Sequence, residues 1–231
     1  DVSMVPTLMT ELVADLNRTK GMPPMVEAAM AHLNFVMIHP FRDGNGRVAR
    51  ALQTLVLVRA GITVPEFSSI EENLAHNERS YYDVLAKVGR GHWSPHGATG
   101  PWMRFNLAAH FRQARTVQRR FRLAELTAQL ADQALDGADV PKRVLPAIEH
   151  VLSGYALRNS SYRSLHDHEI SQNLASRDLT ALVNAGILEQ HGVKRGAQYV
   201  LSEHLRRQAL EARRRVREEI DVGADPYELL R

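Results

Sequence analysis

The sequence predicts a mostly α-helical fold, with an all-helical core followed by a small domain that contains a β-hairpin. Over most of the 231 residues, apolar side chains recur at intervals of three and four, which is the spacing of one face of an α-helix. Only two short runs resemble strands, and they flank a glycine-bounded turn. Hydrophobic residues make up 44% of the chain and charged residues 24%. This composition supports a packed core and excludes a wholly disordered chain.

Five helices are expected in the core. Pro40 disfavours helical geometry at the residue before it, so the second helix should end just before His39. The third helix is apolar nearly all round, as expected for a buried central helix, and Gly61 is suited to end it. Ser69 and Glu72 have the spacing of a capping box at the start of the fourth. The expected ranges are Val5–Arg18, Met25–Ile38, Arg47–Ala60, Glu71–Val88 and Pro101–Leu135.

A second group of elements follows Pro141. Three short helices precede two short strands, and this order is typical of a winged helix-turn-helix domain. A charged helix follows, in which arginines and glutamates alternate as on a solvated surface. We therefore predict a core over residues 1–136, a winged-helix domain over 141–202 and a charged helical segment over 203–231. The expected elements are helices Val144–Leu152, Ser160–Leu165, Ile170–Ala185 and His204–Ile220, and strands Ile187–Gln190 and Gln198–Leu201.

The composition also excludes several classes of protein. The chain has no cysteine, which excludes a disulfide framework, cysteine-ligated zinc, iron–sulfur clusters and thiol catalysis. No apolar run approaches the ~20 residues that a membrane-spanning helix needs. No signal-peptide pattern opens the sequence. We therefore expect a cytoplasmic protein with no membrane partner.

The most informative stretch runs from His39 to Arg50. It places a base, an acid, two glycines, an amide and two guanidiniums at the start of one helix. Backbone N–H groups at a helix N-terminus have no internal partner and attract anions, and glycine lets the backbone press against a ligand oxygen. Arg47 and Arg50 share a helix face. Basic residues there are unfavourable for the helix alone, and a bound polyanion would relieve that conflict.

These residue types fit phosphoryl or nucleotidyl transfer. Asp43 is the carboxylate of the loop, and beside phosphates it is better suited to bind Mg²⁺ than to touch them directly. Imidazole is the side chain best suited to accept a proton at neutral pH, which makes His39 the candidate base. The loop is not a Walker A motif, because no Gly-x-x-x-x-Gly-Lys-Ser/Thr string is present.

The stretch resembles the signature of the Fic family, His-x-Phe-x-Asp/Glu-Gly-Asn-Gly-Arg-x-x-Arg, and matches it at every specified position. The resemblance begins upstream, at Ala29, His32 and Phe35, and continues downstream to Trp102 and Phe105. It implies an all-helical Fic core that lacks its N-terminal part. The winged-helix domain is similar to the tail of many bacterial Fic proteins, which implies a bacterial source.

The resemblance further implies transfer of AMP from ATP to a Ser, Thr or Tyr hydroxyl of a target protein, with release of pyrophosphate. His39 would take the hydroxyl proton, and Asp43 would hold Mg²⁺ between the α- and β-phosphates. Phe41 would be an anchor packed inward, and the Asn45 side chain would contact the α-phosphate. The residues implied to bind the nucleotide are Phe41, Gly44, Asn45, Gly46, Arg47 and Arg50.

Several alternatives stay open. The same site would also suit transfer of another nucleotide or phosphate-bearing group, or removal of AMP from a modified protein. A third hypothesis is a DNA-binding regulator that senses a nucleotide, and a homodimer is left open. Ser68–Asn73 fits the inhibitory string Ser/Thr-x-x-x-Glu-Gly/Asn of some Fic proteins, but we interpret it as the helix cap.

The winged-helix domain would meet DNA through its third helix and its wing. Base edges would be read from that helix, and the wing tip would meet phosphates. The helix face is poor in basic residues, Arg177 has Asp178 beside it as a partner, and such domains also serve as protein-contact modules. The six arginines between Arg104 and Arg122 are interpreted as a solvated helix face. The candidate DNA contacts are Gln172, Asn173, Ser176, Arg177, Lys194 and Arg195.

Overall fold

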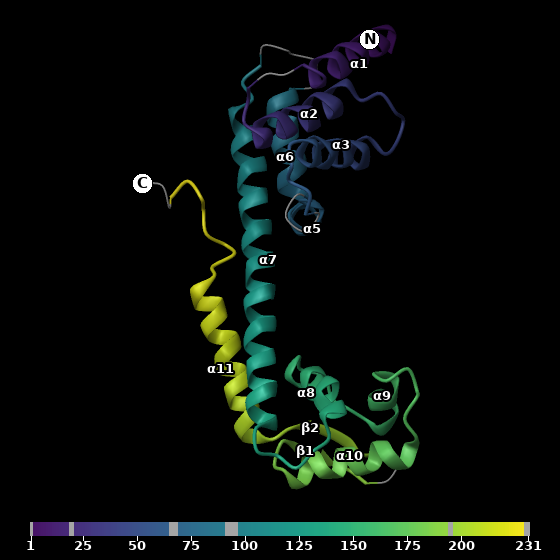
Figure 1. The fold of residues 1–231 in the computed structure, drawn as a ribbon. Helices are drawn as coiled ribbons and strands as arrows, with labels where there is room; N and C mark the ends of the chain where they lie inside the picture. Colours follow the sequence, from purple (N-terminus) through teal and green to yellow (C-terminus); the bar gives the residue numbers. More distant parts are fainter. Residues whose placement is uncertain (1, 19–20, 65–68, 91–96, 194–195, 229–231) are drawn as a thin grey trace. The chain divides into compact units, whose positions relative to one another are not determined.

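The structure, a computed structural model, describes residues 2–18, 21–64, 69–90, 97–193 and 196–228. It consists of helices and one two-stranded hairpin, as Figure 1 shows, so the predicted fold class is confirmed. No described helix combines the length and the apolar character needed to cross a lipid bilayer. In chain order the elements are η1 (Val2–Met4), α1 (Val5–Leu16), α2 (Pro24–Ile38), α3 (Asn45–Arg59), α5 (Glu71–His76), α6 (Glu78–Gly89), α7 (Gly100–Leu135), η2 (Lys142–Val144), α8 (Leu145–Leu152), α9 (Asn159–Ser164), α10 (Gln172–Asn184), β1 (Leu188–His191), β2 (Gln198–Leu201) and α11 (Glu203–Glu219).

The chain divides into two compact units, whose limits differ from the predicted ranges. The first unit joins Asp1–Val117 to Asp221–Arg231, and the second is Gln118–Ile220. The division falls inside α7, because Trp102 is buried in a core of the first unit and Ala131 in the core of the second. Helix α11 also belongs to the second unit, since its apolar side is buried in that same core.

Helix α2 is the most enclosed element of the first unit. One side contacts α1 through Phe35 and Leu12, and another contacts α6 and α7 through Leu33. Ala29 lets α7 approach closely, and the Trp102 indole N–H donates to its carbonyl at 2.7 Å. Helix α3 is less buried than predicted, since Leu55 is 53% exposed. The central helix of this unit is therefore the one that leads into the His39 loop.

The predicted helix Glu71–Val88 is two helices. The break lies at Asn77, whose backbone leaves the helical region (φ −126°, ψ 32°). Its side-chain amide donates to the Asn73 carbonyl at 2.8 Å, a local bond that competes with helical pairing. The predicted capping box is wrong, because the Ser69 hydroxyl accepts from the Glu71 N–H at 3.3 Å and Ile70 is the N-cap.

The second unit packs α8, α9, α10 and the hairpin around one apolar core. Strands β1 and β2 pair antiparallel, with Leu188 opposite Leu201, close to the predicted strands. A bridge from Leu157 to Tyr199 adds a strand position that the sequence did not predict. Helix α10 starts at Gln172, two residues after the predicted Ile170, because the Ser171 hydroxyl caps it by accepting from the Leu174 N–H at 3.2 Å.

Candidate functional site

The predicted phosphate-site residues other than Phe41 line one pocket of about 320 Å³ in the first unit. It lies where α2 ends and α3 begins, and α6 supplies further side chains. We call it the α3 pocket. Its lining is Val36, His39, Arg42, Asp43, Gly44, Asn45, Gly46, Arg47, Arg50, Tyr81, Tyr82 and Leu85.

The His39 side chain is oriented by the end of α2. Its backbone is left-handed (φ 52°, ψ 56°), and its N–H donates to the Phe35 carbonyl at 3.0 Å. The ring Nδ1 lies 3.2 Å from the Val36 carbonyl oxygen. Because a carbonyl only accepts hydrogen bonds, Nδ1 carries the proton and Nε2 keeps its lone pair. The exposed imidazole therefore presents a basic nitrogen in the α3 pocket.

Asn45 closes the loop between the two helices. Its side chain is 4% exposed, accepts from the Phe41 N–H at 3.0 Å and donates to the Phe41 carbonyl at 2.6 Å. The amide oxygen and one amide N–H are thus used on the backbone, and contact of the second N–H with a phosphate stays a prediction. Phe41 itself is 51% exposed, so the prediction that it packs inward is wrong. Its ring lies at the protein surface, 6.1 Å from the ring of Phe35.

The open N-terminus of α3 and two arginines form an anion cradle. Gly44 is the N-cap, with φ 86°, a conformation that side chains rarely adopt. No described side chain caps the helix, so its first N–H groups remain available to a ligand. A Cβ on Gly44 would lie 3.4 Å from a nitrogen of Arg47, and one on Gly46 would lie 3.3 Å from a nitrogen of Arg50. The two guanidiniums therefore lie against the glycine backbone, where the helix attracts an anion.

Asp43 is the one carboxylate in the pocket lining. One of its oxygens accepts from the Gly44 N–H at 2.7 Å, and the other lies 3.4 Å from Arg47 Nη2. Both side chains of this ion pair are exposed, so the pair contributes little to stability. Within the described ranges, no three His, Cys, Asp or Glu side chains group as metal ligands. A single carboxylate still fits Mg²⁺, which commonly takes one or two carboxylates and completes its shell with phosphate oxygens and water.

Arg50 is paired with Glu71 from the start of α5, a contact that the sequence did not reveal. Arg50 Nε lies 3.2 Å from Glu71 Oε1, and the arginine side chain is 24% exposed. Glu72, which matched the inhibitory string, instead accepts from the Gln113 amide at 3.2 Å. The carboxylate of Glu71 therefore partly neutralises the cradle.

We expect Glu71→Gln to tighten the binding of ATP by a few fold. The amide removes a negative charge next to Arg50, and the exposure of the pair keeps the effect to about 1 kcal/mol or less. Calorimetric titration with ATP and Mg²⁺ measures the change. Glu78→Gln, at the start of α6 and outside the pocket lining, is the matched control. Weaker binding by the Glu71 variant would contradict the assignment of Arg50 to the nucleotide.

A buried polar network lies behind the pocket. Gln53 is at its centre, and its oxygen accepts from His32 Nδ1 at 2.6 Å. Its amide nitrogen donates to Asn106 at 3.2 Å and to His110 Nε2 at 2.6 Å. The Tyr81 hydroxyl, which lines the pocket, lies 3.0 Å from His32 Nε2. Since Nδ1 must donate to Gln53, the tyrosine donates to Nε2, and the network holds His32 neutral.

Burial lowers the pKa of His32 to about 4, and burial also raises the pKa of Tyr81 to about 12. An unfolded histidine titrates near 6.5, so between that pH and about 4 the unfolded chain binds the extra proton. The stability that neutral His32 contributes is then fully present above pH 6.5, and it is lost as the pH drops through this window.

We therefore expect about 3 kcal/mol of acid-sensitive stability from His32. Urea unfolding at several pH values should show a smaller loss between pH 6.5 and pH 4 for His32→Gln than for the wild type. His76→Gln, which changes an exposed histidine, should keep the wild-type loss. Parallel curves for the wild type and His32→Gln would show that this group does not carry the effect.

The predicted DNA contacts on α10 are exposed, but two of them have roles within the unit. The Asn159 amide donates to the Ser176 hydroxyl at 2.9 Å and to the Gln172 carbonyl at 3.0 Å. Asn173 and Arg177 are exposed. The predicted pairing of Arg177 with Asp178 is wrong, because Asp178 is buried and pairs with Arg143. Lys194 and Arg195 lie outside the described residues, so DNA contact stays a prediction.

Two members of the arginine run on α7 have partners within their own units, one in another segment and one on α7 itself. Arg104 lies over the Tyr227 ring, 4.3 Å from its centroid. Arg122 pairs with Glu125 at 2.6 Å. These contacts agree with the interpretation of the run as a structural, solvated face.

The loop is similar in sequence to a known protein family. Residues 1–57 match the Fic/DOC family model, and this range includes all of the loop and most of α3. Because of this match, we call residues 1–57 the Fic segment. The matched range ends before α5, α6 and the second unit.

Several curated relatives of the Fic segment are named as protein adenylyltransferases. The chain is 40% identical over 90 residues to "Protein adenylyltransferase Fic" of Culex quinquefasciatus, covering 38% of this chain and 17% of that protein. It is 41% identical over 64 residues to "Protein adenylyltransferase fic-1" of Caenorhabditis briggsae, covering 25% and 13%. A probable protein adenylyltransferase of Aquifex aeolicus is 33% identical over 91 residues, covering 38% and 28%. The chain thus spans less than a third of the length of these relatives.

Similar solved structures include a Fic family protein from Desulfovibrio desulfuricans G20, with a TM-score of 0.45 and 22% identity, covering 87% of this chain and 56% of that one. A likeness at that score carries no argument about this fold.

Proposed function

We propose that the chain is a protein adenylyltransferase, which transfers AMP from ATP to a hydroxyl side chain of a target protein and releases pyrophosphate. The observation that carries the proposal is a histidine with a free Nε2 in the same pocket as an uncapped helix N-terminus and two arginines. The adenylyltransferase names of relatives of the Fic segment support the choice of reaction.

The geometry suggests how the reaction would proceed. The target hydroxyl oxygen attacks the α-phosphorus, and the bond from that phosphorus to the bridging oxygen of the β-phosphate breaks. Pyrophosphate leaves, and the hydroxyl proton passes to His39 Nε2. The first N–H groups of α3, with Arg47 and Arg50, stabilise the negative charge on the phosphates. Asp43 would hold a magnesium ion, which would neutralise phosphate charge when bound.

Two labelled forms of ATP test this reaction. The chain is incubated with Mg²⁺ and a cell lysate, once with the label on the α-phosphate and once with it on the γ-phosphate. We expect acid-stable protein label from the α-position alone. Label from the γ-position would identify phosphoryl transfer instead, and the absence of label in every lysate tried would oppose the proposal.

Transfer of another group is the competing proposal of the same class. The α3 pocket accounts for phosphates but contains no feature that selects adenine. Equal concentrations of ATP, GTP, UTP and CDP-choline separate the donors, and release of free AMP from a pre-modified protein detects the reverse activity. We expect ATP to be the preferred donor.

A further inference from the structure

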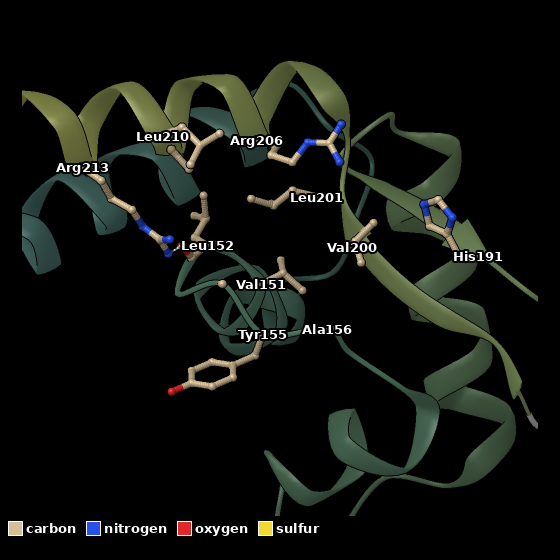
Figure 2. Close-up of a pocket in the computed structure, with 12 residues that line it drawn as sticks. Val151, Leu152, Tyr155, Ala156, His191, Val200, Leu201, Arg206, Leu210 and Arg213 are labelled. Carbon is tan, nitrogen blue, oxygen red and sulfur yellow. Dashed lines mark hydrogen bonds between the residues drawn. The ribbon is translucent and has the colours of Figure 1, made fainter.

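The second unit contains a cavity of about 490 Å³, unrelated to the Fic segment. It lies between α8, the hairpin and α11, as Figure 2 shows, and we call it the α11 cavity. Its volume is in the range of small-molecule sites, ~300–1,000 Å³. Its lining is Val151, Leu152, Gly154, Tyr155, Ala156, His191, Val200, Leu201, Arg206, Ala209, Leu210 and Arg213.

Most of the lining is apolar and part of it remains exposed. Val151, Leu152 and Leu201 are buried and form the apolar interior of the cavity. Leu210 is 57% exposed and Tyr155 is 65% exposed. Large apolar side chains left in contact with water around a concavity favour an apolar ligand.

The charges of the lining are positive. Arg206 and Arg213 are seven residues apart on α11, two helical turns, and Figure 2 shows both on the cavity side of the helix. No Asp or Glu lines the cavity. The next arginines along the helix are each paired, Arg207 with a glutamate at 3.2 Å and Arg214 with another at 3.0 Å.

The two cavity arginines differ in what holds them. Arg213 Nη2 donates to the Leu152 carbonyl at 2.8 Å, and its guanidinium lies where a Cβ on Gly154 would come within 3.1 Å. The left-handed φ of Gly154, 101°, also favours glycine there. Arg206 has no ion-pair partner among the residues that the structure describes. Its guanidinium is thus the cation that remains for a ligand.

We propose that the α11 cavity binds a small amphipathic carboxylate, with its apolar body on Val151, Leu152 and Leu201 and its carboxylate on Arg206. A guanidinium binds a carboxylate through two parallel hydrogen bonds, which a neutral ligand cannot reproduce. The proposal is independent of the activity of the first unit.

Methyl NMR on the full chain, labelled at leucine and valine, tests the proposal with naphthalene-2-carboxylate as the probe. We expect shifts at the methyl groups of Val151, Val200, Leu201 and Leu210. The neutral analogue 2-naphthylmethanol should bind about tenfold more weakly or worse, because it lacks the charged hydrogen bonds. Inorganic phosphate, which has no apolar body, should leave these methyl groups unchanged.

Matched variants test whether carboxylate binding depends on Arg206 itself or on positive charge in general. Arg206→Gln should weaken the carboxylate to the level of the alcohol, while Arg207→Gln, one residue away, should leave its affinity unchanged. Both arginines are exposed, so both variants should fold. Equal loss in the two variants, equal affinity of acid and alcohol, or shifts elsewhere on the chain would overturn the proposal. A concentration-dependent shift of the same methyl groups without probe would also overturn it, by showing that a second copy covers the cavity.

Discussion

Replacing His39 with alanine should reduce transfer of AMP by between about 10²- and 10⁴-fold, the usual contribution of a general base. The structure gives the reason, since Nδ1 is held by the Val36 carbonyl and Nε2 alone is left to take the hydroxyl proton. The phosphate cradle does not include this imidazole. Binding of ATP, measured by calorimetry, should therefore change little while the rate of labelling collapses.

His76→Ala is the matched control for this prediction. His76 is also exposed and also places its Nδ1 against a backbone carbonyl, that of Glu72 at 2.7 Å, but it lies outside the α3 pocket. Its loss should leave transfer unchanged. Labelling by the His39 variant at the wild-type rate would remove the histidine from the mechanism, and failure of that variant to bind ATP would make it a structural residue of the cradle.

Arg143→Met should destabilise the second unit and lower its urea midpoint. The Asp178 side chain is 3% exposed and accepts from Arg143 at 2.7 and 2.8 Å. Without the arginine, a buried carboxylate would keep only the hydroxyl of Tyr162, at 3.0 Å. Loss of one partner from a buried pair is strongly destabilising, and the 40% exposure of the arginine reduces this loss.

Urea unfolding followed by circular dichroism measures this change. Lys142→Met removes a neighbouring exposed charge and should unfold with the wild type. The double variant Arg143→Met/Asp178→Leu should recover part of the loss, because no buried charge is then left without a partner. Identical midpoints for Arg143→Met and Lys142→Met would show that the pair contributes nothing measurable.

The sequence predicted the helices well wherever local signals end them. Pro40 ended α2 at Ile38, as predicted. The break at Asn77 was missed because apolar spacing continues across it, and the competing side-chain bond to Asn73 is visible only in three dimensions. The limits of the units were missed because α7 reads as one continuous helix, whichever core each end enters.

The residues of the candidate site were easier to group from the sequence than the side chains that contact them. Residues His39 to Arg50 are contiguous, so their grouping needs no tertiary information. Glu71 is 21 residues beyond Arg50, and nothing in the spacing brings them together. The contact between Gln53 and His110 was likewise not predicted, because a buried polar network has no periodic pattern in the sequence. The role of Phe41 was misjudged because the resemblance supplied it, whereas the loop geometry leaves its ring exposed.

The central claim is that a nucleoside triphosphate binds at the open N-terminus of α3. Amide NMR on the full chain, titrated with Mg²⁺ and a non-hydrolysable ATP analogue, tests this most directly because it needs no target protein. The account predicts that the largest shifts fall on the backbone N–H groups of Gly44, Gly46 and Arg47. Binding with the largest shifts elsewhere, or no binding at concentrations that saturate other nucleotide sites, would contradict it.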